Sequence, residues 1–341
     1  MFLHSYKIIS TVFVISLLFL SCRKEKQIEP APETPQTYAL TPYVVKYPYY
    51  FPKLNIPSNN PLTIEGINLG RKLYYDNILS NNGLSCSSCH NSNQAFTTYA
   101  SNSLAHINLA WNSHFLWNGK ISGTIEDIMM FEVEEFFSTD VSKLNNSSYY
   151  KTEFKKVYNV DYITSQNIAF ALSQFFRAMV SSNSLCDKFF LHTANLNTSQ
   201  MNGFNIFTTE KGDCFHCHSI GLFADDNFHN IGIDSVFTGV NRGRYNITLN
   251  NNDMGLFKTP TLRNIALTAP YMHDGRFQTL EEVVEHYNSG VKHSVTLDPI
   301  MTKPSKLYGL GLSAIDKQDL VNFLKTLTDT SFIQNPLLQN P

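Results

Sequence analysis

The chain has 341 residues, 43% of them hydrophobic, and its formal net charge is −2. This length supports one large domain or two medium-sized ones, each with a hydrophobic core. The near-neutral charge gives no reason to expect a nucleic-acid partner.

The first 21 residues predict that the protein is exported. Lys7 precedes an apolar run from Ile8 to Leu20, which is too short to span a bilayer and is typical of a secretory signal. Cys22 follows directly and resembles the lipidated cysteine of bacterial lipoproteins, with a plain signal peptide as the alternative. We therefore expect a signal peptide at 1–21 and a protein of the periplasm or outer membrane, which contacts the membrane through a lipid on Cys22.

Residues 22–61 predict a tether that follows the lipid anchor. The segment is rich in proline, which prevents regular helices when it is this dense. Its last part, YPYYFPKLNIP (47–57), carries several tyrosines. We expect this part to lie as an extended strap against the folded domain.

Helical patterns dominate the remainder of the chain. Apolar residues recur at helical spacing in TIEGINLGRKLYYDNILS (63–80) and SQNIAFALSQFFRAMVSS (165–182). TLEEVVEHYNSG (279–290) and SAIDKQDLVNFLKTLTD (313–329) each begin with a Ser or Thr that an acidic residue follows three positions later, as in a capping box. Clear strand alternation is scarce, so we expect a mainly α protein.

One motif, C-x-x-C-H, occurs twice, at Cys86–His90 and at Cys214–His218, 128 residues apart (214 − 86). Two thiols at this spacing can bond the vinyl groups of haem, and the following histidine is then held under the iron. A zinc ribbon usually has its two C-x-x-C pairs closer together and needs no histidine after each. A redox C-x-x-C usually opens a helix after a strand, and no such strand is evident. Two such motifs in an exported chain favour haem.

Two further residues are not expected to bind a haem. Cys186 has no evident partner, and we expect it to be buried among apolar residues. His216 lies inside the second motif, where the motif's geometry turns it away from the iron, so we expect it at the surface.

Long stretches around both motifs resemble the family of di-haem bacterial cytochrome c peroxidases and MauG. The similarity runs from Ile64 to Thr328 and is carried by LGRKLYYDNILSNNGLSCSSCHNSNQAFT, FLWNGK, GDCFHCHSIGLFADDNFHNIGI, FKTPTLRNIALTAPYMHDGRFQTLEEVVEHYNSG and LVNFLKTLTD. The resemblance implies two cytochrome c-like helical domains, each with one covalently attached haem, and one calcium ion between the haems. The implied organisation is an N-terminal peroxidatic haem domain at 62–185, a C-terminal electron-relay haem domain at 186–330 and a tail at 331–341.

The family assigns different roles to the two haems. The resemblance therefore implies peroxide chemistry at the haem on Cys86, Cys89 and His90, and electron relay at the haem on Cys214, Cys217 and His218. Trp117, in FLWNGK, matches the family's tryptophan between the haems, where an aromatic ring can relay electrons. A large core anchor is the alternative for this residue. Asn102, Thr268 and Pro270 match the family's calcium ligands, and neutral oxygen donors suit that ion.

Two departures from the peroxidase pattern concern the outer faces of the haems. Tyr287 stands where the peroxidases supply methionine to the relay haem, which resembles MauG and predicts a lower reduction potential. Met272, Met301 and His286 are the lesser candidates for this ligand. The segment NSNQAFTTYASNS after the first motif lacks the peroxidases' histidine, which predicts an open first haem. We expect the nearby His106 and His114 to be structural.

An acid-base group should assist cleavage of the O–O bond above the open iron. The family uses a glutamate after the tryptophan, but the local sequence, IEDIMMFEVEEFFSTD, departs from the family pattern. An ungapped match falls on Ser138 and a small shift selects Glu135, with Glu134 and Glu132 as alternatives.

These features predict an oxidoreductase of the cytochrome c peroxidase type. It would reduce hydrogen peroxide to water with electrons from a small redox protein, a cytochrome c or a cupredoxin. One alternative is MauG-like, peroxide-dependent oxidation of residues on a partner protein. A second, of another class, is a non-catalytic di-haem electron carrier. The resemblance also allows a homodimer, for which the sequence holds no independent signal.

Overall fold

The computed structural model describes residue 1 and residues 38–98, 102–306 and 309–341. The expected signal peptide and the lipidation site at Cys22 lie outside these residues. Tyr38–Pro341 forms one compact unit. This unit is mainly helical, which confirms the expected fold class at that level. Across the part of the chain that is described, no helix combines the length and hydrophobicity needed to cross a membrane.

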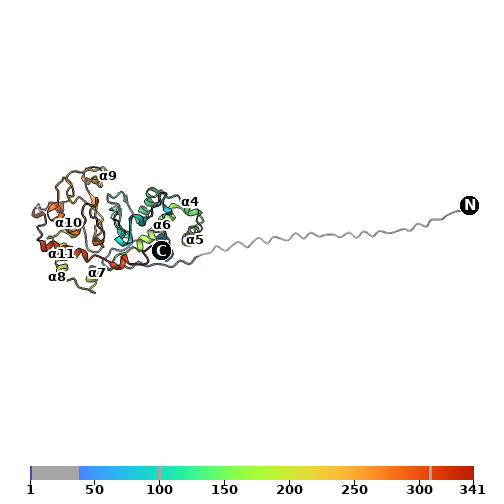
Figure 1. The fold of residues 1–341 in the computed structure, drawn as a ribbon, viewed down its shortest axis with the longest axis horizontal. Coiled ribbons are helices and arrows are strands. Elements are labelled where there is room, and N and C mark those ends of the chain that lie inside the picture. The colour runs from blue at the N-terminus through green and yellow to red at the C-terminus, as the bar shows by residue number, and fades with distance from the viewer. Residues whose placement is uncertain (2–37, 99–101, 307–308) are drawn as a thin grey trace. The chain divides into compact units, whose positions relative to one another are not determined.

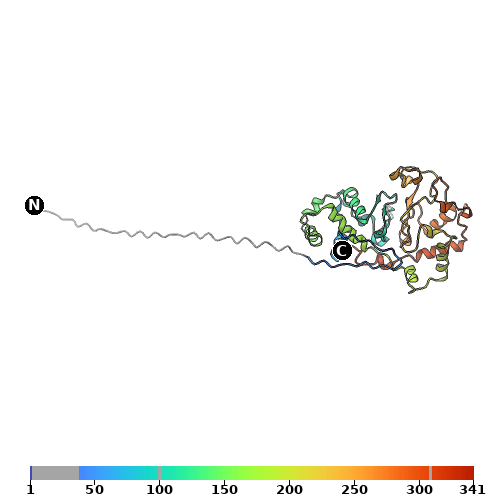
Figure 2. The same ribbon diagram turned by 180° about the vertical axis from the view of Figure 1, so that it is seen from behind.

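The helices gather in two lobes, with α4, α5 and α6 in one and α7, α8, α10 and α11 in the other (Figure 1; Figure 2 shows the reverse side). The helices are α1 (Ile64–Tyr75), α2 (Cys86–Cys89), α3 (Ile125–Phe131), α4 (Val141–Asn146), α5 (Ser148–Tyr158), α6 (Ser165–Ala178), α7 (Leu185–Phe190), α8 (Thr198–Phe207), α9 (Tyr245–Thr248), α10 (Leu280–Glu285), α11 (Ala314–Lys325) and α12 (Thr330–Ile333).

Short two-stranded sheets and π-helical turns complete the architecture. Strand β1 (His114–Phe115) pairs antiparallel with β2 (Ile121–Ser122), and β3 (Phe228–His229) pairs antiparallel with β4 (Phe257–Lys258). A π-helical turn at Glu132–Phe136 continues α3, and another at His286–Gly290 continues α10. Such turns insert an extra residue into a helix and are common at functional sites.

Each lobe is built around a pair of helices that cross at a glycine. Gly70 of α1 packs on α6, where an added Cβ would collide with the carbonyl oxygen of Ala171. Gly203 of α8 packs on α11 in the same way, against the carbonyl oxygen of Asp319. Because only glycine permits so close a backbone approach, both crossings depend on it. The repeat of helix and motif in the sequence is therefore also a repeat in structure.

Two hydrophobic cores correspond to the two lobes. The first includes Leu69, Leu73, Phe154, Phe175 and Phe176, and the second includes Phe207, Phe223, Leu320, Phe323 and Leu327. The segment 331–341, which we expected as a tail, contributes Phe332 and Leu338 to the first core.

The segment 38–61 lies along the folded unit, so the packed strap begins before the expected stretch 47–57. Val45 and Leu54 are buried in a small apolar cluster, with Trp111 packed against it. The Tyr50 hydroxyl donates a 2.7 Å hydrogen bond to Asp187, which also pairs with the fully buried Arg263. These contacts anchor the strap on both its apolar and its polar side.

Candidate haem sites

The first C-x-x-C-H motif lines a cavity of about 500 Å³. Cys86, Cys89 and His90 all face this space. The His90 Nδ1 atom lies 2.9 Å from the carbonyl oxygen of Phe96. Because a carbonyl only accepts, Nδ1 carries the proton and Nε2 keeps its lone pair for a metal. Burial lowers the pKa of His90 to about 4, which keeps the imidazole neutral.

The second motif repeats this construction. Cys214, Cys217 and His218 line a second cavity of about 500 Å³, and His218 Nδ1 lies 2.9 Å from the carbonyl oxygen of Phe223. Burial lowers the pKa of His218 to about 4. Phe96 and Phe223 have φ angles of 61° and 53°, a left-handed conformation that is rare for bulky residues. The same strained backbone position thus presents a carbonyl to the histidine in both lobes.

The residues around each cavity fit a c-type haem. All four motif cysteines are free thiols, as thioether formation requires. Each neutral histidine has an unprotonated Nε2, which is the form that binds iron. Each cavity is large and most of its surface is apolar, which suits a porphyrin ring.

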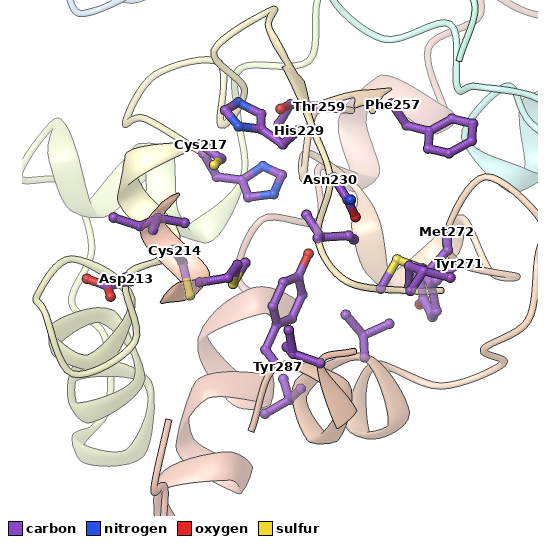
Figure 3. Close-up of a pocket in the computed structure, with 18 of the residues that line it drawn as sticks. Asp213, Cys214, Cys217, His229, Asn230, Phe257, Thr259, Tyr271, Met272 and Tyr287 are labelled. Atoms are coloured by element: carbon purple, nitrogen blue, oxygen red, sulfur yellow. The ribbon is translucent and has the colours of Figure 1, made fainter. Parts of the chain in front are cut away.

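Tyr287 enters the second cavity from the π-helical turn after α10. Figure 3 shows its ring rising into the space between the motif cysteines and the segment of Tyr271 and Met272. Burial raises the pKa of the Tyr287 hydroxyl. Met272 and Met301 also line this cavity. His286 does not, and its Nε2 bonds the carbonyl oxygen of Ile231 at 3.0 Å.

A charged group that the sequence did not indicate borders the second cavity. His229 lines it and lies between two carboxylates, 2.8 Å from Asp225 and 2.6 Å from Asp298. Burial alone would lower the pKa of His229, but its hydrogen bonds to the two carboxylates and the neighbouring Cys217 raise that pKa above its ordinary value. Asp298 is 69 residues from His229, so no local spacing reveals the pair.

The candidate carboxylates for the first cavity are placed unequally. Of the four positions considered, Glu132 alone lines the cavity. Glu134, Glu135 and Ser138 are exposed, and Glu135 pairs with Lys120 at 3.4 Å. Burial raises the pKa of Glu132 to about 7. The π-helical turn that begins at Glu132 changes which residues face inward, so neither the ungapped match to Ser138 nor the shifted match to Glu135 selects the residue that lines the cavity.

Trp117 lines both cavities. Its indole Nε1 donates to the carbonyl oxygen of Asn102 at 3.1 Å, and its carbonyl oxygen accepts from the Lys258 backbone at 2.8 Å. Asn102, Thr268 and Pro270, the expected calcium ligands, all line the first cavity. The fold therefore brings these three residues and the tryptophan to the junction of the lobes.

An ion pair of the second lobe lies at the same junction. Lys258 is buried and lies 2.9 Å from Asp226, which accepts hydrogen bonds from both the backbone and the hydroxyl of Ser113. His114 Nδ1 bonds the Asp226 carbonyl oxygen at 3.0 Å. These bonds join the first lobe, which supplies Ser113 and His114, to the second.

Three further residues named in the sequence analysis can be compared with their expected positions. Cys186 is fully buried, as expected. His216 is exposed, as expected, and its Nε2 atom lies 3.3 Å from a carboxylate oxygen of Glu210. His106, expected to be structural, instead lines the first cavity and stacks on His90, with ring centroids 3.4 Å apart.

Comparison with known proteins places these cavities in context. A family model described as di-haem cytochrome c peroxidase matches residues 64–195. The methylamine utilization protein MauG of Methylophilus methylotrophus is 30% identical over 306 residues, covering 83% of this chain and 88% of that protein. The cytochrome c551 peroxidase of Nitrosomonas europaea is 31% identical over 252 residues, covering 67% of this chain and 75% of that protein.

Solved structures agree with these matches. A MauG-like protein associated with microbial copper homeostasis superimposes with a TM-score of 0.81 at 30% identity, covering 88% of this chain and 99% of that one. The diheme peroxidase BthA of Burkholderia thailandensis E264 superimposes with a TM-score of 0.63 at 17% identity, covering 89% and 99%, and supports the fold alone.

Proposed function

The chain belongs to the di-haem cytochrome c peroxidase family, and from that premise we propose that it is an oxidoreductase that reduces hydrogen peroxide to water. The observation that carries the proposal is the position of Trp117, which lines both cavities. Each cavity presents two thiols and a neutral imidazole, so one aromatic ring lies between two haem sites.

The two haems are held by equivalent residues. Cys86 and Cys89 would form the thioether bonds of the first and His90 would bind its iron, as Cys214, Cys217 and His218 would for the second. When bound, each haem supplies an iron that can exchange electrons and, at an open face, bind peroxide. The bond from each histidine Nδ1 to a carbonyl fixes the ring and directs Nε2 to the metal.

Glu132 replaces Glu135 and Glu134 as the proposed acid-base group of the first cavity. Its carboxylate takes the proton from the nearer peroxide oxygen and returns it to the farther one, so that water can leave. A pKa of about 7 suits both steps, because the group can accept and donate near neutral pH. Glu134 and Glu135 are exposed and outside the cavity, which argues against them.

Tyr287 is the proposed outer ligand of the second haem. Burial raises its pKa, so a phenolate there needs a neighbouring cation, and the iron would provide one. This residue also favours a second candidate function, the MauG-like oxidation of residues on a partner protein. The sequence similarity to MauG proteins supports the same alternative.

Further parts of the proposal concern the surroundings of the haems. Asn102, through its side chain, and Thr268 and Pro270, through their carbonyls, would hold calcium at the junction. We infer export through the signal peptide at 1–21 and a lipid anchor on Cys22. The electron donor would be a small cytochrome c or cupredoxin, and a homodimer is compatible with the family.

Turnover with defined donors tests the proposal. Purified protein should contain two covalent haems per chain and consume peroxide when a reduced cytochrome c or cupredoxin is supplied. Oxidation of donor in proportion to peroxide supports the peroxidase. Peroxide consumption that is coupled instead to oxidation of a partner protein supports the MauG-like alternative. If both haems exchange electrons with donors but the protein never consumes peroxide, both enzyme functions are excluded and the non-catalytic electron carrier is supported.

A further inference from the structure

His106 in the first lobe and Leu262 in the second occupy equivalent positions. The backbone N–H of His106 donates to the carbonyl oxygen of Phe96 at 3.1 Å. The backbone N–H of Leu262 donates to that of Phe223 at 3.2 Å. These are the two carbonyls that also hold the motif histidines. Each residue therefore sits beside the axial histidine of its own lobe.

Tyr74 and Phe207 form a second equivalent pair. Each lies four residues, one helical turn, after the glycine at which its helix crosses its partner, Gly70 in α1 and Gly203 in α8. Both aromatic side chains are almost completely buried. The second lobe thus uses an apolar pair, Phe207 with Leu262, where the first lobe uses Tyr74 with His106.

The polar pair of the first lobe is therefore not required by the fold. The second lobe forms the same helix crossing and the same carbonyl contact with hydrocarbon side chains. A buried hydroxyl and a buried imidazole are more costly to desolvate than a phenyl ring and an isobutyl group. This cost points to a role for Tyr74 and His106 that is specific to the first cavity.

Both residues of the polar pair contact His90. The Tyr74 hydroxyl donates to the carbonyl oxygen of His90 at 3.1 Å and lies 3.2 Å from His106 Nδ1. The hydroxyl has a single hydrogen, and this hydrogen is donated to the carbonyl. His106 Nδ1 must therefore carry a proton and donate it in a hydrogen bond to the hydroxyl oxygen. The His106 ring is then held against the His90 ring at a 3.4 Å centroid separation and a 14° interplanar angle.

We propose that His106 and Tyr74 are positioning residues for His90: they fix the plane of its imidazole through a polar pair at positions where the second lobe has the apolar pair Phe207 and Leu262. The proposal rests on the proposed haem site at His90. Phe176 also packs edge-on against His106, with ring centroids 4.8 Å apart, which limits rotation of the His106 ring.

The test installs the second lobe's pair in the first lobe, as His106→Leu with Tyr74→Phe. Covalent haem is counted, and the reduction potential of each haem and the iron–histidine stretching band of the reduced protein are then measured. We expect two haems per chain, a shifted and broadened band, and an upward shift of the first haem's potential alone, because a less polar neighbourhood disfavours the charged ferric state. His114→Leu removes another histidine of the same cavity, one that contacts Asp226 rather than His90, and should leave the iron–histidine band unchanged.

An unchanged band and unchanged potentials in a double variant with two haems would overturn the positioning role. If the double variant loses haem, Tyr74→Phe alone decides the question, since it removes both hydrogen bonds and keeps the ring. A shift in its band supports the proposal, and no shift overturns it. Unaltered protein that lacks a covalent haem at the first motif would instead contradict the proposed function, so the two failures are distinguishable.

Discussion

The two cavities share one frame and differ in the residue that reaches each from a π-helical turn. In both lobes the carbonyl of a left-handed phenylalanine holds the motif histidine at 2.9 Å. A short helix that begins with a capping box, α3 or α10, then leads into a π-helical turn. That turn supplies Glu132 to the first cavity and Tyr287 to the second. A proposed proton-transfer group and a proposed iron ligand thus arise from equivalent π-helical turns.

The cavities also differ in charge. The second is bordered by His229 between two carboxylates, whereas the first has the neutral pair of His90 and His106. A fixed ion cluster and a phenol suit a closed site that holds its metal in one coordination state. A neutral, stacked histidine with an unbonded carboxyl group nearby suits an open site where a small substrate enters.

Removing each cysteine pair separately should have the largest effect, because each variant loses the covalent attachment of one haem. Cys86→Ser with Cys89→Ser should leave one covalent haem per chain and abolish the response to peroxide, because the open site is lost. Cys214→Ser with Cys217→Ser should also leave one haem, keep the response to peroxide and lose donor-driven turnover. Haem staining after denaturation and stopped-flow spectra measure both effects. The opposite assignment of the responses would exchange the roles of the lobes.

Replacing the carboxyl group of the first cavity should have the next largest effect. Glu132→Gln should slow the reaction with peroxide roughly 10²–10⁴-fold, since it removes acid-base assistance. Glu134→Gln, two residues away and exposed, is the matched control and should react at the normal rate. Equal rates in both variants would mean that Glu132 has no part in O–O cleavage.

The same carboxyl group sets the expected pH dependence. Burial raises the pKa of Glu132 to about 7, and the ionised form accepts the first proton from peroxide. The second-order rate constant should therefore rise as the pH increases through about 7 and level off above it. Rapid-mixing measurements on the Glu132→Gln variant should give a flat profile across this range. A profile that keeps the same inflection in this variant would assign it to another group.

Changing the tyrosine of the second cavity should alter a potential rather than abolish a reaction. Tyr287→Phe should change the low-spin ferric spectrum and raise the second haem's potential by on the order of 0.1 V, within the roughly 0.8 V that axial ligands span. Tyr271→Phe is the control, because Tyr271 lines the same cavity but donates its hydroxyl to the Ile265 carbonyl. If Tyr287→Phe leaves spectrum and potential unaltered, Met272 or Met301 becomes the better candidate.

The helix crossings should give the smallest effect, one of stability. Gly70→Ala places a methyl group against the Ala171 carbonyl and should reduce the free energy of unfolding by about 1–3 kcal/mol. Gly203→Ala should have a similar effect in the second lobe, against the Asp319 carbonyl. Denaturant titrations of both variants compare the lobes directly. An unaffected midpoint in either would show that its helices can separate without cost.

The parts of the site that short sequence motifs encode could be predicted. The parts that depend on helix register or on long-range contacts could not. The paired motifs, the position of Trp117 at both cavities and the entry of Tyr287 into the second follow from short matched stretches. Glu132 was named only as an alternative, because one extra residue in a π-helical turn changes which side chains face inward.

Long-range contacts explain the other omissions. The stack of His106 on His90 depends on how the chain returns to the Phe96 carbonyl, and residue spacing does not encode that approach. The pairing of His229 with Asp298 joins segments 69 residues apart. The C-terminal segment packs Phe332 and Leu338 into the first core because it runs back to that lobe, whereas the family resemblance implied a tail.

The central claim, that the first haem site is open and the second closed, is tested most directly by adding hydrogen peroxide to the fully ferric protein without prior reduction. Absorption and electron paramagnetic resonance spectra should show a high-spin ferric haem whose signal changes at once with peroxide, beside a low-spin haem. Two low-spin haems that do not respond to peroxide would contradict the account.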